Sequence, residues 1–302
     1  MKSLQPFDAH STQNLGLLTF FLQTGDAVKN RYGTLVAADE IESRLLRGQP
    51  NSASPWRKIA FLGELDDLIV VLVRPRNPLN IGAAARAMSN FGARSLRVVN
   101  PYKEGFREAK SAVGGSSILK NAEQFESVAD AIADCALVVG TTAIGSRTLQ
   151  YPPRCLDADT GAVVRSRLQN GRVAILFGSE KTGLSNDDFS HCHWLLHIPT
   201  HQNNISMNLG QAVAVCLYEF ARSTPAKAEK VELATAATTE QITQGLLDAL
   251  RMSGYIKPGT AAMFEKKTRQ LILRFGLEAY DAKLLLGMVR QIVWKLRQAD
   301  KT

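Results

Sequence analysis

The 302-residue chain has few of the features that mark special classes of protein. It contains only 11 prolines and 22 glycines and no run of 18 apolar residues, which excludes collagen-like, wholly disordered and membrane-spanning chains. Its four cysteines lie far apart without a Cys-x-x-Cys pair, and no secretory signal follows Met1, so we expect a cytoplasmic protein. The 36 Lys and Arg residues exceed the 28 Asp and Glu residues, and the net charge of +8 favours polyanionic partners such as nucleic acid.

Several common catalytic motifs are also missing. Residues 140–148 have the glycine spacing of a P-loop, but Ser146 stands where that motif requires lysine. No G-x-G-x-x-G follows a strand pattern, and no serine lies in G-x-S-x-G, so an ordinary dinucleotide-binding dehydrogenase and a hydrolase are disfavoured. The histidines and the cysteine within residues 191–201 match no usual zinc spacing, and we expect no metal there.

The middle of the chain alternates strand and helix patterns. Runs rich in β-branched residues predict strands at 68–73, 95–99, 136–139, 172–177 and 195–198. Between and after them, helical spacing predicts helices at 81–91, 127–134, 157–168 and 209–222. This alternation predicts an α/β domain over residues 67–223, with a mostly parallel sheet covered by helices on both faces.

The two ends of the chain have a different composition. We assign no fold to residues 1–66, which leaves open a divergent appendage, a disordered extension and upstream sequence wrongly joined to the true start. Residues 224–239 have the composition of a linker, and 240–302 predict a small helical domain with helices at 241–251, 261–275 and 279–298. Its excess of basic residues fits either RNA contact or an ordinary solvated face.

Three segments in the α/β region resemble the SPOUT superfamily of RNA methyltransferases, and within it the TrmH-like ribose 2′-O-methyltransferases of the TrmJ type. The first is the Asn, Gly and Arg pattern of residues 74–88, which opens a helix after the first predicted strand. The second spans residues 176–184, and the third spans residues 198–209 and runs into a helix. Their order, spacing and placement at strand ends carry the resemblance.

The resemblance implies a deep C-terminal trefoil knot, a homodimer and S-adenosylmethionine as cofactor. Physical reasoning agrees with such a site, because the carboxyl ends of parallel strands meet at one edge of a sheet and glycines there let the backbone approach a ligand. Taken singly, each glycine also fits a tight turn. The cofactor-binding residues that the resemblance implies are Thr141, Thr142, Ala143, Gly178, Ile198, Ile205, Ser206 and Met207.

The resemblance also implies the residues that carry the chemistry. A guanidinium is not a base at neutral pH, so we expect Arg86 to grip the phosphate beside the target ribose and to stabilise the developing alkoxide. Ser206 and Asn208 then position the hydroxyl, and Asn80 and Glu180 brace the site. The rival interpretations are a surface ion pair for Arg86, a helix N-cap for Ser206 and an internal salt bridge for Glu180.

These expectations define one leading hypothesis and its alternatives. The leading hypothesis is methylation of a ribose 2′-hydroxyl in the anticodon loop of tRNA, at nucleotide 32, with Arg147 as a further RNA contact. The alternatives are ribose methylation of ribosomal RNA and a non-catalytic RNA-binding module with a degenerate core. No membrane partner is expected.

Overall fold

The computed structural model describes residues 65–102, 114–143, 152–201, 205–225 and 231–299, together with the short paired strands β1 (Val28–Lys29) and β2 (Leu35–Val36). The chain divides into two compact units, residues 1–61 and residues 62–302. The predicted α/β domain and the predicted C-terminal helices both belong to the second unit, which is described below.

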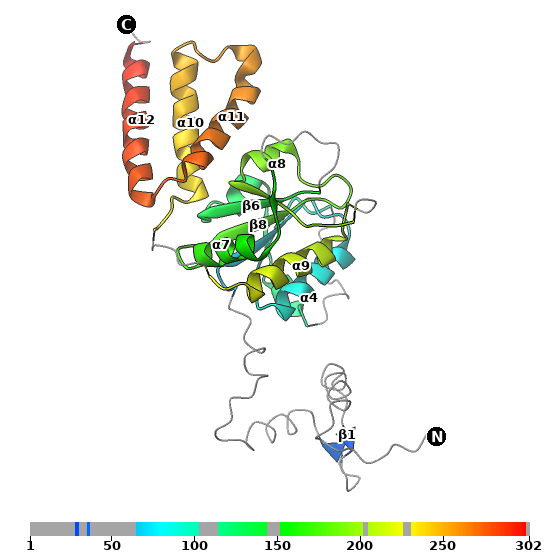
Figure 1. Cartoon of the computed structure of the whole chain (residues 1–302). Coiled ribbons are helices and arrows are strands. Elements are labelled where there is room, and N and C mark those ends of the chain that lie inside the picture. Colours follow the sequence, from blue (N-terminus) through cyan, green and yellow to red (C-terminus); the bar gives the residue numbers. More distant parts are fainter. Residues whose placement is uncertain are drawn as a thin grey trace. The chain divides into compact units, whose positions relative to one another are not determined.

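Seven strands of this unit form one sheet, and every pairing in it is parallel (Figure 1). Across the sheet they lie in the order β5 (Glu123–Phe125), β4 (Ser95–Val99), β3 (Leu68–Val73), β8 (Val173–Phe177), β6 (Leu137–Thr141), β9 (Trp194–His197) and β7 (Arg154–Cys155). The α/β prediction and its five strands are therefore confirmed. The two unexpected strands, β5 and β7, are edge strands of three and two residues, too short to produce a periodic pattern in the sequence.

The interior strand β3 shows why the sheet needs a cover on both faces. Leu68, Val70 and Leu72 point into one apolar cluster, and Ile69 and Val71 point into the other. Successive side chains of a strand point to opposite faces, so an uninterrupted apolar run is compatible only with a sheet buried on both sides. The knot expected from the resemblance stays a prediction.

Helices supply that cover. On one face lie α4 (Pro78–Asn90), α5 (Ser116–Lys120), α7 (Ala158–Leu168) and α9 (Leu209–Arg222). On the other face lie α6 (Val128–Ala131) and α8 (Asn186–Ser190). The helix predicted at 127–134 is thus reduced to the four residues of α6. The packing of α4 against α9 is close, because a Cβ atom on Gly210 would meet the Ala83 side chain at 2.7 Å.

Three further helices follow the sheet domain: α10 (Ala236–Met252), α11 (Ala261–Phe275, preceded by the 3-10 turn Pro258–Thr260) and α12 (Ala279–Ala299). In Figure 1, α10 lies between the other two. The helical prediction is confirmed, but the predicted linker extends too far, because residues 236–239 form the first turn of α10. The Thr235 side chain caps this turn, and Ala236 N donates to Cys135 O of the sheet domain at 2.8 Å.

Within the described ranges, none of the helices combines the length and the hydropathy needed to cross a membrane.

Candidate methyl-donor pocket

A pocket of about 390 Å³ opens at the carboxyl ends of β6, β8 and β9. These strands are neighbours in the sheet, so the loops that follow them converge at one edge. The volume lies within the roughly 300–1,000 Å³ range of small-molecule sites. All eight residues expected to bind cofactor line this pocket: Thr141, Thr142, Ala143, Gly178, Ile198, Ile205, Ser206 and Met207.

The loop after β8 forms one wall of the pocket by doubling back on itself. Gly183 N donates to Ser179 O at 2.7 Å, and Gly183 has a φ of 66°, in the left-handed region that favours glycine. The two arms of the loop lie so close that a Cβ atom on Gly178 would come within 2.1 Å of the Gly183 and Leu184 backbone. Any side chain at position 178 would therefore change the shape of the pocket wall.

The floor of the pocket is apolar and rigid. Phe177 and Leu184 contribute side chains that are at most 2% exposed, and Phe189 of α8 adds a buried ring. The Thr141 hydroxyl donates to Leu176 O at 2.8 Å and so ties the end of β6 to β8. An apolar floor beneath converging backbone groups is the arrangement expected for a site that binds an adenosine-containing ligand mainly through main-chain contacts.

At the rim of the pocket, Glu180 is held by three hydrogen bonds. Its carboxylate accepts from the backbone N–H groups of Arg76 and Asn77, at 2.8 and 3.1 Å, and from Asn80 Nδ2 at 2.9 Å. Asn80 Oδ1 in turn accepts from Asn208 Nδ2 at 3.0 Å. This carboxylate network joins the start of α4, the loop after β8 and the segment before α9.

The ionised carboxylate determines the orientation of both amides. Partial burial raises the pKa of Glu180, but the hydrogen bonds from Asn80 and the two backbone N–H groups outweigh it, so the pKa is lowered and the carboxylate only accepts. Asn80 must therefore turn its NH₂ group to Glu180 and its oxygen to Asn208. The oxygen of Asn208 is then left to accept from Gly210 N at 3.0 Å, which caps α9.

The network corrects two rival interpretations. Asn208, not Ser206, is the N-cap of α9, so capping does not account for Ser206. Glu180 forms no ion pair with a Lys or Arg of the described ranges; its partners are Asn80 and backbone N–H groups. The catalytic and binding roles of these residues stay predictions.

Arg86 lies apart from this network. It is exposed on α4, does not line the pocket of its own chain and makes no ion pair with another described residue. The rival interpretation of Arg86 as part of a surface ion pair therefore finds no partner in the described part of the chain. Arg147, the further predicted RNA contact, lies outside the described residues.

The histidine and cysteine cluster has structural surroundings. Among the described residues, no three His, Cys, Asp or Glu side chains lie close enough together to hold a metal ion. His193 Nδ1 accepts from Val138 N at 3.1 Å, and burial lowers the pKa of His193 to about 4. Cys192 is buried, and burial raises the pKa of its thiol.

Several pocket residues escaped prediction from sequence. Most of them, such as Phe177 and Thr182, adjoin the predicted residues in the chain. Phe189 and Ala212 reach the pocket from α8 and α9, and a helical residue facing a pocket has the same apolar spacing as one facing a core. Only the fold reveals them.

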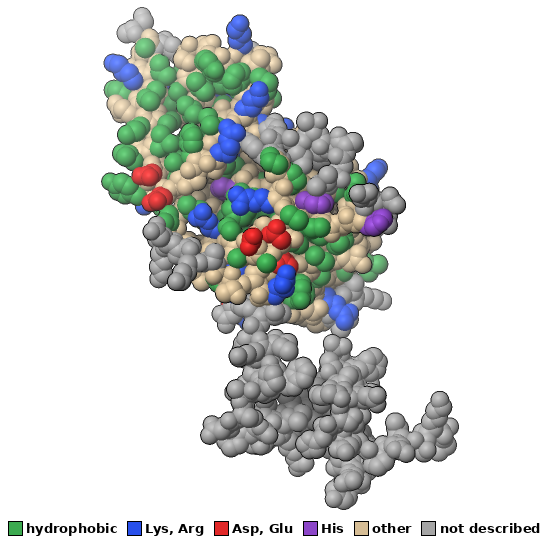
Figure 2. Space-filling view, in the orientation of Figure 1, with side chains coloured by type: hydrophobic (Ala, Val, Ile, Leu, Met, Phe, Trp, Pro, Cys, Tyr) green, Lys and Arg blue, Asp and Glu red, His purple; other side chains and the backbone are tan. Residues whose placement is uncertain are grey.

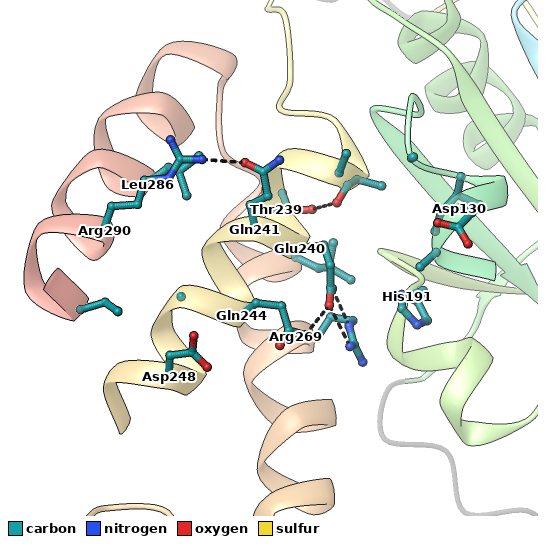
Figure 3. Close-up of a pocket in the computed structure, with 18 of the residues that line it drawn as sticks. Asp130, His191, Thr239, Glu240, Gln241, Gln244, Asp248, Arg269, Leu286 and Arg290 are labelled. Carbon is teal, nitrogen blue, oxygen red and sulfur yellow. Dashed lines mark hydrogen bonds and ion pairs between the residues drawn. The ribbon is translucent and has the colours of Figure 1, made fainter. Parts of the chain in front are cut away.

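A second cavity, of about 600 Å³, lies between the sheet domain and the C-terminal helices (Figure 3). Asp130 and His191 line it from the sheet domain, opposite Glu240 and Arg269 from α10 and α11. Arg269 donates to Glu240 through two nitrogens, at 2.7 and 3.0 Å. None of the predicted site residues lies in this cavity.

Comparison with known proteins agrees with this geometry. Residues 67–218 match the model of the SpoU rRNA Methylase family. The chain is 33% identical to the tRNA (cytidine/uridine-2′-O-)-methyltransferase TrmJ of Sodalis glossinidius, over 76% of this chain and 92% of that protein. It is likewise 33% identical to the TrmJ of Citrobacter koseri, over 76% of this chain and 97% of that protein.

A solved structure extends the likeness to the fold. The crystal structure of TrmJ from Z. mobilis ZM4 superposes with a TM-score of 0.67 at 30% identity, covering 74% of this chain and 98% of that chain. The matched family region contains all three motifs on which the resemblance rested. The chain therefore belongs to the SpoU family of RNA methylases.

Proposed function

We propose that this protein is an S-adenosylmethionine-dependent methyltransferase that modifies a ribose 2′-hydroxyl of tRNA, at nucleotide 32 of the anticodon loop. The observation that carries the proposal is the pocket at the ends of β6, β8 and β9 with the carboxylate network at its rim. The names of the TrmJ relatives support tRNA and the 2′-oxygen as the site of methylation. The enzyme acts in the cytoplasm, in keeping with its four free cysteines.

The residues of the pocket fit the cofactor. S-adenosylmethionine, when bound, supplies an electrophilic methyl group on a sulfonium, so the protein needs only to hold it and to present the acceptor oxygen. The apolar floor and the backbone groups near Gly178 and Ile198 would hold the cofactor. The buried floor also keeps water from the methyl group.

The acceptor side of the site is built from Ser206, Asn208 and Arg86. Asn208 is already committed to Asn80 and to the cap of α9, so it holds the segment that carries Ser206. The Ser206 hydroxyl lines the pocket and forms no hydrogen bond with another described side chain, which leaves it available to the ribose 2′-hydroxyl. Arg86 binds the adjacent phosphate and stabilises the negative charge that develops on the ribose 2′-oxygen as the hydroxyl proton passes to solvent water.

Arg86 reaches this site in a homodimer. Leu79 and Arg86 lie seven residues apart on α4, so they share one face of the helix, and both are exposed. The neighbouring helix α9 exposes Val215 and Tyr218 on its own outer face. A second copy that covers this apolar face supplies the Arg86 that the pocket lacks within one chain.

Ribosomal RNA is the second candidate substrate, because the matched family is named for the methylation of rRNA. The deciding experiment incubates the purified full chain and labelled S-adenosylmethionine with tRNA or rRNA transcripts and maps the methylated nucleotide by mass spectrometry. Methylation of tRNA at nucleotide 32, abolished by a 2′-deoxynucleotide there, supports the proposal. Methylation of rRNA alone would transfer the assignment to the second candidate. If the full chain does not bind S-adenosylmethionine at all, the protein is an RNA-binding module.

A further inference from the structure

The short helix α8 contacts both the methyl-donor pocket and the C-terminal helices. We propose that α11 positions the pocket wall through α8, so that the hydrogen bond between Arg269 and Ser190 contributes to the affinity for S-adenosylmethionine. Arg269 and Ser190 are then positioning residues that act through α8 and do not touch the cofactor. The inference rests on the proposed function in one respect, the identity of the ligand.

One side of α8 belongs to the pocket. Phe189 lines the pocket floor. Asp188 accepts from Ser185 N at 2.6 Å and from the Ser185 hydroxyl at 2.8 Å, and so fixes the residue directly after the wall-forming loop. The loop and α8 therefore move together.

Asp188 also anchors the start of the carboxylate network. Its carboxylate accepts from both terminal nitrogens of the Arg74 guanidinium, Nη1 and Nη2, and Nη1 lies 3.1 Å from Oδ1. Arg74 has a φ of 51°, which a residue with a side chain adopts only when its surroundings hold it there. Two residues later in the chain, Arg76 N donates to Glu180. Asp188 thus connects α8 to the backbone that holds the rim of the pocket.

The other side of α8 is held by α11. Ser190 is completely buried, and its hydroxyl oxygen accepts from Arg269 Nη1 at 3.0 Å. The Arg269 side chain is only 7% exposed and is fixed by Glu240 of α10 at 2.7 Å (Figure 3). Glu265 of α11 holds it a second time, at 3.0 Å. A buried guanidinium with all its partners in place is a rigid point of attachment.

A helix of five residues cannot hold its own position. Isolated helices of this length are unstable in water, so α8 lies where its contacts place it. Asp188 and Phe189 fix α8 on the pocket side, and Ser190 fixes it on the α11 side. Because packed interiors transmit small displacements, losing the hydrogen bond at Ser190 lets α8 shift, and the pocket wall shifts with it.

The contact between Arg269 and Ser190 differs from the other contacts of Arg269. Its ion pair with Glu240 joins α11 to α10, and its ion pair with Glu265 lies within α11, so both stay among the C-terminal helices. Among the hydrogen bonds that Arg269 forms with described residues, only the one to Ser190 crosses to the sheet domain, at a sequence separation of 79 residues. Lys266 also approaches Asp187 of α8, at 3.4 Å, but both are partly exposed and their attraction is screened.

The test removes this bond together with the hydrogen bond that the Ser190 hydroxyl donates to Asp187 O within α8, at 2.7 Å. The comparison with Arg269→Lys, which leaves the bond within α8 in place, separates the two. In the full chain, Ser190→Ala keeps the ion pairs of Arg269, and calorimetric titration measures the dissociation constant of S-adenosylmethionine. We expect the dissociation constant to rise about three- to tenfold, less than the full contribution of a hydrogen bond to a charged group, because this bond acts on the pocket only through α8. In methylation assays the KM for the cofactor rises while kcat at saturating cofactor stays unchanged.

Two variants separate positioning from general destabilisation. Ser166→Ala deletes a buried hydroxyl from α7, and Thr243→Val deletes one from α10; neither of these hydroxyls donates to α8. Both variants should bind the cofactor within about twofold of the original chain. Arg269→Lys keeps the charge but loses the fork, and its effect should not add to that of Ser190→Ala, since both remove the same bond.

Linkage supplies a second readout that does not depend on activity. If α11 strengthens cofactor binding, the cofactor must stabilise α11 by the same factor. Hydrogen exchange at the amides of residues 261–275 should slow on addition of S-adenosylmethionine, and less so in Ser190→Ala. Unchanged affinity in Ser190→Ala, or unchanged exchange in the original chain, overturns the inference while the proposed function stands. Failure of the original chain to bind the cofactor overturns both.

Discussion

The sheet domain and the C-terminal helices bury their apolar residues to very different extents. All six residues of β3 are at most 2% exposed, and the sheet lies between two large apolar clusters. The helices α10–α12 share only two small clusters, and α12 leaves Leu284, Met288 and Ile292 each 53% exposed. In Figure 2, hydrophobic side chains gather on the visible surface of these helices.

This difference in burial shows that the two regions are stabilised in different ways. The sheet domain is stabilised mainly by its own burial, and it carries the pocket and the carboxylate network. The helices depend on a few defined contacts with it, among them the bond of Arg269 to Ser190, and they keep an apolar surface exposed. The candidate site thus lies on the region with the larger apolar core, which suits the precise positioning that catalysis requires.

The largest effect should come from Arg86, which tests whether the chemistry lies in the sheet domain. Arg86→Ala should reduce tRNA methylation about 1,000-fold, because the developing charge loses its stabilising cation, while the cofactor dissociation constant stays within about twofold. Methylation assays and calorimetry measure the two quantities. The matched Arg290→Ala on α12, where Arg290 donates to Gln241, should lose less than about tenfold. Loss of cofactor binding in Arg86→Ala would contradict the assigned role.

The difference in burial between the two regions can be tested by making the same Leu→Ala substitution once in each region. Leu72→Ala in β3 should lower the free energy of unfolding by about 3 kcal/mol, because it opens a cavity at a fully buried position. Leu284→Ala on α12 should change it by less than about 0.5 kcal/mol. Denaturant titration measures both, and equal effects would show that α12 is buried in solution by a partner.

The carboxylate network should matter more than a carboxylate on the helical side. Glu180→Gln turns an acceptor into a group that also donates, which leaves Asn80 or the Arg76 N–H unpaired. We expect kcat/KM to fall about 30-fold. Glu232→Gln, an exposed residue before α10, is the matched control and should be neutral. Steady-state kinetics with both substrates varied measure kcat/KM. A Glu180→Gln enzyme with unchanged kcat/KM would show that the carboxylate network has no part in catalysis.

The smallest effect concerns the pH dependence of stability in the sheet domain. Burial lowers the pKa of His193 to about 4, so the folded protein binds fewer protons than the unfolded chain, whose histidine titrates near 6.5. Stability from this residue is present above about pH 6.5 and is lost progressively as the pH falls towards 4. His193→Asn retains an acceptor for Val138 N and should lose less stability over this interval in denaturant titrations. Parallel curves for the two proteins would exclude His193 as the cause.

Much of the fold was predictable because its signals are local. The helix predicted at 209–222 has those bounds in the structure, since Asn208 caps it and its apolar residues recur at helical spacing. The predicted strands lie within one or two residues of the observed ones. The edge strand β7 was missed because its two residues are held by pairing with β9, a contact that leaves no periodic trace.

The candidate site was predictable in part for a related reason. Parallel strands end at one edge of a sheet, so the loops that follow them were expected to meet in space. The individual pocket residues from Thr141 to Met207 were named from the family resemblance, and all of them line the pocket. Phe189 could not be named, because nothing in a five-residue helix indicates which of its sides faces a ligand.

Local chemistry along the chain thus specified the five longer strands of the sheet, most of the helices and the positions of the loops that line the pocket. The pairings that hold these pieces in place came only from folding, since Arg74 meets Asp188 across 114 residues and Arg269 meets Ser190 across 79. Arginine, aspartate and serine are common residues, and each has many potential partners along the chain. Which partner each one meets depends on the order of strands in the sheet and on how helices pack over it, and those are properties of the whole molecule.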